Sequence, residues 1–204
     1  MMSRRILTAG LAFGVALGAA GAPPSHDPDW PCQQIKVPQL SLAAVWSGPP
    51  LDAHQDDWRQ DQQVVELLHD VAQRRVPIEQ AQADIRTFAV QAEDQKQARL
   101  LRLLAGLFAV LNDERSMVVA GLGRFGARQK ELAAQLRSDN EKLRSMQADH
   151  AADAGEVNQL TQRVTWESQV FQDRRQALSY ACDVPGKIEQ RLFALARTIQ
   201  EVLQ

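Results

Sequence analysis

A long heptad repeat in the second half of the chain is the feature that most constrains its fold. Stepping alternately by three and four residues from Leu101 to Met146 meets apolar side chains at nearly every position. The polar exceptions are Arg115, Gln129 and Asp139. A heptad sustained over so many turns is typical of a coiled coil. We therefore expect one helix over residues 94–148, roughly 80 Å long at 1.5 Å per residue.

A second heptad follows a polar turn at residues 149–155 and predicts an antiparallel partner for the first. Its members are Val157, Leu160, Val164, Glu167, Phe171, Arg174, Leu178 and Ala181. One register pairs Met146 with Val157 near the turn and Leu122 with Ala181 far from it. The pattern therefore predicts a helical hairpin over residues 113–185, with its tip at the turn.

This register has two further consequences. It brings Gln129 beside Arg174, which we interpret as a polar core layer that fixes the pairing of the helices. It also places Gly121 opposite Cys182. We expect the missing side chains of Gly121, Gly123 and Gly126 to make room for a disulfide and for the incoming segment at Trp30 and Pro31, a hinge being the alternative. The polar run at residues 112–115 precedes the hairpin. We interpret it as a solvated face with intrahelical pairs, the alternative being a polar binding site.

The segments that flank the hairpin predict a helical base over residues 53–112 and 186–204. Apolar stripes at helical spacing mark a helix at 53–74, a second helix opened by Pro77, and a last helix near the carboxyl end. The sequence Asp183-Val184-Pro185-Gly186 should break the chain between hairpin and base. The predicted fold is therefore all-α, a four-helix base with a long antiparallel coiled-coil hairpin.

Residues 21–52 are expected to form an extended, proline-rich arm ahead of the base. Of nine prolines, all but Pro77 and Pro185 lie between Pro23 and Pro50, which excludes a long helix there. The segment also carries many apolar side chains, which a disordered tail would not need. They include Trp30, Ile35, Val37, Leu40, Leu42, Val45 and Trp46. We therefore expect the arm to lie along the helices.

The first 20 residues have the pattern of a secretory signal peptide. Arg4 and Arg5 precede the short apolar run 6–20, and cleavage is expected between Ala20 and Ala22. The run is too short and too rich in glycine for a membrane-spanning helix. These features predict export to the periplasm by the general secretory route, with membrane contact only through an uncleaved leader.

Export makes a disulfide between Cys32 and Cys182 the expected state, because two cysteines in an oxidising compartment usually pair. We expect a structural disulfide between them, the alternative being two buried thiols. No C-x-x-C redox motif is present.

No motif in the chain predicts catalysis, so we expect neither an enzyme nor a cofactor. Charges of both signs alternate along the helices at a net charge of −2, which argues against nucleic-acid binding. His54, Asp57 and Asp61 share one helix face and could hold a metal ion. Carboxylates at a helix start are ordinary capping residues, so our prediction is that no metal binds.

The predicted shape suggests a function, because a stiff arm is useful where reach is needed. We expect an exported envelope scaffold or adaptor that contacts an envelope protein at the tip of the hairpin. The candidate contact residues are Asp149, His150, Asp153 and Glu156. A solvated turn without a partner is the alternative for the tip.

Two other functions stay open for the whole protein, a small-ligand or metal-binding bundle and a hairpin-type periplasmic chaperone. Homo-oligomerisation is compatible with either. The predicted layout is similar in kind to hairpin adaptors of tripartite exporters and to tentacled periplasmic chaperones. This likeness is one of architecture and carries over no residues.

Overall fold

The computed structural model describes residues 27–51 and 57–204, and within them the only regular structure is helical. The elements in chain order are α1 (Leu42–Val45), the 3-10 turn η1 (Asp57–Gln60), α2 (Gln62–Ala72), α3 (Ile78–Gln91), the 3-10 turn η2 (Glu93–Gln95), α4 (Lys96–Ala148), α5 (Ala154–Cys182) and α6 (Val184–Leu203). The prediction of an all-α fold is confirmed. The expected leader at 1–20, its cleavage region and His54 lie outside the described residues.

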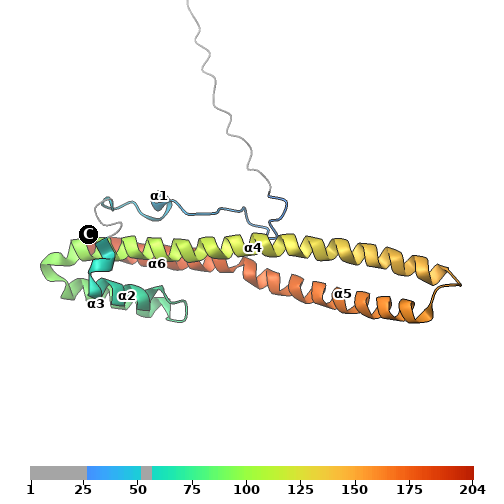
Figure 1. Ribbon diagram of the computed structural model, residues 1–204. Coiled ribbons are helices and arrows are strands. Elements are labelled where there is room, and N and C mark those ends of the chain that lie inside the picture. Colours follow the sequence, from blue (N-terminus) through green and yellow to red (C-terminus); the bar gives the residue numbers. More distant parts are fainter. Residues whose placement is uncertain (1–26, 52–56) are drawn as a thin grey trace, which may run out of the picture.

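Helix α4 is the spine of the molecule and runs its whole length (Figure 1). It spans 53 residues without interruption, as the heptad repeat predicts. α5 returns beside the distal half of α4, and α6 returns beside the proximal half (Figure 1). The long antiparallel hairpin is therefore present, formed by α5 and the distal part of α4.

The predicted break between hairpin and base is present but short. Only Asp183 separates α5 from α6, and its backbone stays in the right-handed helical region (φ −80, ψ −19). Pro185 stands in the first turn of α6, where its missing N–H leaves no hydrogen bond unmade. The chain therefore bends at Asp183 and continues as α6. Helices α5 and α6 together form a nearly continuous antiparallel partner of α4 (Figure 1).

The base is a four-helix cluster in which α6 packs on α4 and α3, and α2 packs on α4 and α3. Its largest fully buried side chains come from all four helices. They are Val64, Val71, Ile85, Leu100, Leu103, Leu104, Leu107, Leu111, Ile188, Leu192, Leu195 and Ile199. At roughly 1.5–3 kcal/mol for each buried aliphatic side chain, this cluster is the main source of stability.

The first helix of the base starts later than its predicted range of 53–74. Asp61 adopts an extended backbone (φ −98, ψ 100), and its carboxylate accepts a hydrogen bond from the Val64 N–H at 3.3 Å. This N-cap separates η1 from α2. The acidic residues that the sequence placed inside one helix therefore lie before it and at its cap.

Arg191 of α6 fixes the far end of α2. Its side chain is buried and donates hydrogen bonds to the carbonyl of Val71 at 2.8 Å and that of Val76 at 2.9 Å. Burial lowers the pKa of this guanidinium from its ordinary value. A cation at the carboxyl end of a helix satisfies carbonyls that lack intrahelical partners, which explains a charge in this core.

Residues 27–51, here called the strap, run antiparallel to α4 along one side of it (Figure 1). Apart from the single turn α1 they have no regular structure. At the start of the strap, Lys36 donates a 2.6 Å hydrogen bond to Asp27, and this bond lowers the pKa of the Asp27 carboxyl. At its other end, Trp46 and Leu51 are buried in the core of the base.

Candidate functional site

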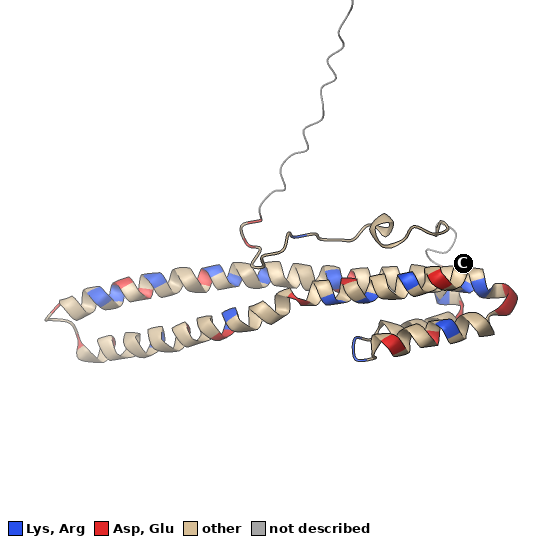
Figure 2. Cartoon of the chain, turned by 180° about the vertical axis from the view of Figure 1, so that it is seen from behind, with Lys and Arg blue, Asp and Glu red and all other residues tan. Residues whose placement is uncertain are grey.

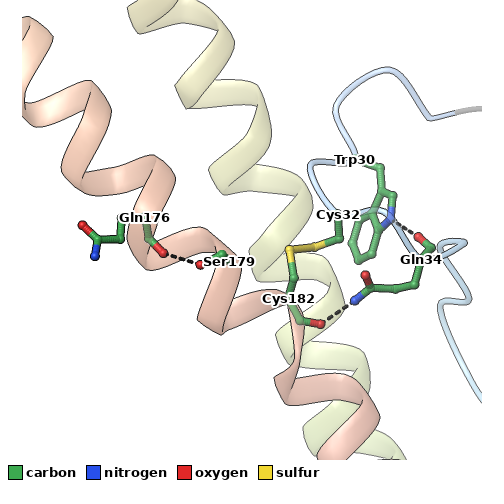
Figure 3. The surroundings of a disulfide bond; sticks show 6 residues. All are labelled: Trp30, Cys32, Gln34, Gln176, Ser179 and Cys182. Carbon is green, nitrogen blue, oxygen red and sulfur yellow. Dashed lines mark hydrogen bonds between the residues drawn. A yellow bond between two sulfur atoms is a disulfide. The ribbon is translucent and has the colours of Figure 1, made fainter.

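A disulfide between Cys32 and Cys182 fastens the strap to the root of the hairpin (Figure 3). The two Cα atoms are 5.7 Å apart, and the expected pairing is confirmed. Around it, Trp30 Nε1 donates to the Gln34 carbonyl at 2.6 Å, and the Gln34 amide donates to the Cys182 carbonyl. The bond therefore lies within a small network that joins the strap to the end of α5.

Of the glycines expected to make room for this attachment, Gly126 does so and Gly121 does not. A Cβ on Gly126 would lie 2.0 Å from the Asp29 carbonyl oxygen and 3.1 Å from Pro31. A Cβ on Gly121 would meet only the Arg124 guanidinium, at 3.9 Å. Five residues separate the two glycines, about 140° around the helix, so they face different sides of α4.

Asn112 and Arg115, the two ends of the polar run at 112–115, clamp the strap, so the interpretation of the run as a solvated face was wrong for these two residues. Asn112 accepts from the Leu40 N–H at 2.9 Å and donates to the Leu40 carbonyl at 3.2 Å. Arg115 is only 4% exposed, pairs with Glu189 and donates to the Val37 carbonyl at 2.7 Å. The backbone N–H and C=O groups of an irregular strap lack the hydrogen-bond partners that a helix or a sheet would provide. The side chains of Asn112 and Arg115 supply such partners.

A cavity of about 470 Å³ lies where strap, hairpin and base meet. Its lining includes Trp30, Ile35, Arg115, Lys187 and Glu189. Arg115 and Glu189 are already engaged with each other there. A cavity of about 460 Å³ also lies in the base, beside Asp57, Asp61, Arg99 and Arg102. A small-ligand site, one of the alternatives from the sequence, would have room at either place.

A smaller groove of about 270 Å³ opens between α4 and α5 on the Gly121 side. Every residue that lines it is apolar: Val118, Gly121, Leu122, Phe125, Ala177, Leu178 and Ala181. The register predicted from the heptads pairs Leu122 with Ala181 and Phe125 with Leu178, and both pairs line this groove. The strap does not reach this side, so the groove is open to solvent.

The predicted polar layer of Gln129 and Arg174 does not form. Gln129 is half-buried and donates from Nε2 to the Phe171 carbonyl at 2.9 Å, which does join the two helices. Arg174 is exposed. A two-helix seam is narrow, so a long cationic side chain at its edge extends into water.

The four candidate residues of the tip are all exposed at the end of the hairpin. Two of the acids have local structural roles. Asp149 accepts from the Ala151 N–H at 2.9 Å, and Asp153 caps α5 by accepting from the Glu156 N–H at 2.9 Å. His150 and Glu156 present their side chains to solvent without such a bond among the described residues. The tip is thus a capped polar turn that also exposes charged groups.

Asp57 and Asp61, the carboxylates of the weak candidate metal site, already interact with arginine side chains. Asp57 receives a 3.0 Å hydrogen bond from Arg102, and Asp61 lies 3.2 Å from Arg99. Within residues 27–51 and 57–204, no group of three or more His, Cys, Asp or Glu side chains is arranged to hold a metal ion. Because His54 is not described, the full candidate set is not assembled here.

The surface around the open groove was not predicted from the sequence. Met117, Trp166 and Tyr180 are 60%, 67% and 69% exposed, which is unusual for large apolar side chains. On α5 a second 4-3-4-3 stripe carries this surface: Trp166, Val170, Asp173, Ala177 and Tyr180. This stripe is visible in the sequence beside the first heptad and could have revealed a second packing face.

Comparisons with family models, curated proteins and solved structures found no match to this chain. In the described part of the protein, no helix combines the length and the hydropathy that crossing a membrane requires.

Proposed function

We propose that this protein is a non-enzymatic scaffold or adaptor of the cell envelope, exported to the periplasm, whose hairpin carries a protein-interaction surface. The observation that carries the proposal is the shape of the molecule. The tip stands at the opposite end of α4 from the base and from the carboxyl terminus (Figure 1). A continuous helix of 53 residues separates the two ends by roughly 80 Å.

The chemistry of the arm supports an interaction role. Beyond its root, few hairpin side chains are buried, among them Leu136, Leu160 and Val164. The remaining length of both helices is accessible surface that contributes little to the core. A partner that binds near the tip would thereby be held far from whatever contacts the base.

The disulfide supports the proposed location. Cys32 and Cys182 are bonded, and such structural bonds persist in oxidising compartments and are rare in the cytosol. Together with the leader pattern in the sequence, this favours export. Cell fractionation of the full chain is the direct measurement, and recovery of reduced, full-length protein in the cytoplasm would overturn this part of the proposal.

The test of the interaction role replaces residues 148–156 by a short Gly-Ser turn. Because the tip makes only local hydrogen bonds, we expect the helical circular dichroism signal to be kept. Cross-linked capture of partners from envelope extract should be lost. Capture that survives this replacement would exclude the tip as the contact surface and direct attention to the cavity at the hairpin root.

Matched tip variants separate charge from capping. Asp149→Asn with Asp153→Asn removes two charges but keeps side-chain acceptors for the turn and the helix cap. His150→Ala with Glu156→Ala removes the two side chains that serve no capping role. If the tip recognises charge, the first pair weakens capture without changing thermal stability. If both pairs leave capture intact while the Gly-Ser turn abolishes it, the shape of the tip is what is recognised.

A further inference from the structure

Helix α5 carries two apolar stripes, and α4 covers only one of them. The first is the heptad that faces α4, with Leu160 and Val164 buried. The second runs through Trp166, Val170, Ala177 and Tyr180 and is interrupted by Asp173. Trp166 and Ala177 are eleven residues apart, about three full turns, so they point in nearly the same direction. A helix with a second stripe of this kind is shaped to pack against a second helical neighbour.

The second stripe and the apolar groove form one surface, here called the open face. Ala177 belongs to both, and Met117 lies one turn from Gly121, which lines the groove. The strap is fastened on another side of the hairpin, at Gly126 and Cys182. The open face is therefore uncovered although the hairpin root is held on its other side.

Charges at the edges of the open face indicate what covers it. On the α4 edge are Arg124, whose guanidinium folds toward Gly121, and Arg128 one turn further along. Neither forms an ion pair within the described residues. On the α5 edge is Asp173, which accepts only a hydrogen bond from the neighbouring Gln169 at 2.8 Å. The other charged residues of α5 are Glu156, Arg163, Glu167, Arg174 and Arg175, and most of the helix is tan in Figure 2.

We infer that the open face binds the open face of a second copy of this chain, with the two hairpins parallel and their tips pointing the same way. A two-fold axis along the hairpin puts α5 of each copy against α4 of the other. The groove pairs Phe125 with Leu178, so Arg128 and Asp173 lie within one turn of the same level. Each copy then sets its Asp173 against Arg128 of its partner, and both ion pairs form at once.

The charges also disfavour the opposite orientation. With tips pointing apart, α4 would face α4, and Arg124 and Arg128 of both copies would be brought together, with Glu131 as the one acid on that stripe of α4. Like charges so placed disfavour association. In the parallel arrangement, Tyr180 of each copy lies beside Arg124 of the other instead. A cation over an aromatic ring is favourable.

The size of the open face predicts a weak, reversible dimer. From Trp166 to Tyr180 it is about 20 Å long and about two helix diameters wide. Such a surface falls at the low end of specific interfaces. The association should therefore depend strongly on protein concentration, and the strap and the disulfide should not take part in it.

Sedimentation velocity of the full chain over a range of concentrations tests the inference. We expect the apparent mass to rise toward twice that of the monomer. Trp166→Glu should abolish the rise, since its side chain is 67% exposed and its loss leaves the core intact. Asp173→Arg and Arg128→Asp should each raise the dissociation constant about tenfold or more, and the two together should restore it.

Val90→Glu on α3 is the matched control, because Val90 is 78% exposed and lies off the open face. It should leave the dissociation constant unchanged, and all variants should keep the circular dichroism spectrum of the parent. A protein that stays monomeric at the highest soluble concentration overturns the inference, as does a dimer that Trp166→Glu leaves intact. Failure of the double charge reversal to restore binding overturns the parallel arrangement.

Discussion

The two halves of α4 have similar heptad patterns but very different surroundings. In the base, α4 is enclosed by α2, α3 and α6, and its leucines at 100, 103, 104, 107 and 111 have no exposed surface. In the hairpin it has one neighbour, α5, and only a few seam residues, such as Leu122 and Leu136, are buried.

This difference shows that the number of neighbouring helices, and not the repeat itself, decides how much a leucine contributes to the stability of the fold. A residue in a four-helix cluster is surrounded on all sides, whereas one in a two-helix seam keeps an edge in water. Stability should therefore be concentrated in the base, and the hairpin should be its more easily opened extension.

The largest expected effect comes from replacing one leucine by alanine in each region. Leu104→Ala in the base should lower the free energy of unfolding by about 3–5 kcal/mol, because a fully enclosed cavity cannot collapse. Leu160→Ala in the hairpin, at 6% exposure in the parent, should cost about 2 kcal/mol or less, because the seam can close or admit water. Urea denaturation of both variants measures the difference. Equal losses would contradict the comparison.

Removal of the disulfide is the next test, since it ties the strap to the point where the two regions meet. Cys182→Ser, with Cys32→Ser to avoid a free thiol, should lower the free energy of unfolding by about 2–4 kcal/mol. The buried Trp46 and Leu51 keep the far end of the strap in the base. Hydrogen exchange should therefore speed up near Trp30 and stay slow near Leu51, and uniform exchange along the strap would show that the bond holds the whole segment.

Two glycines of α4 form a matched pair with opposite signs. Gly126→Ala places a methyl group against the Asp29 backbone and should destabilise the protein by about 1–3 kcal/mol despite the better helix propensity of alanine. Gly121→Ala meets no close contact and should stabilise the helix by up to about 1 kcal/mol. Thermal unfolding compares them. The loss at Gly126 should shrink when Cys32 and Cys182 are both replaced by serine, because the strap can then move away.

The smallest expected effect is at Arg174 on the exposed edge of the hairpin. Arg174→Leu should change the free energy of unfolding by no more than about 0.5 kcal/mol, as is usual for exposed positions without a specific partner. Gln129→Leu removes the 2.9 Å hydrogen bond to the Phe171 carbonyl and should cost about 1 kcal/mol. A larger loss at Arg174 than at Gln129 would show that the charge, not the amide, joins the two helices.

Local pattern was sufficient for the helices but not for the contacts between distant segments. The heptads predicted α4 to its last residue and the turn before α5, because both depend on side chains a few positions apart. Pro77 likewise marked the start of α3. The disulfide was predictable from the presence of two cysteines in a chain with an export pattern. The exposed apolar stripe of Trp166 was not predicted, because it lies beside a stronger heptad.

The sequence by itself determined that this protein is helical, that its longest helix is unbroken and that it folds back on itself, since periodicity and turn residues act within one or two turns of chain. Only the tertiary structure decided the roles of Arg115 and Asn112, and it singled out Gly126 from Gly121 and Gly123 as the glycine against which the strap packs. Each serves a strap that is some 70 or more residues away in sequence, as the separation of 72 between Leu40 and Asn112 illustrates. An irregular strap has no periodicity of its own, so its unpaired backbone groups determine which side chains it needs, and these become apparent only when the helix lies beside it.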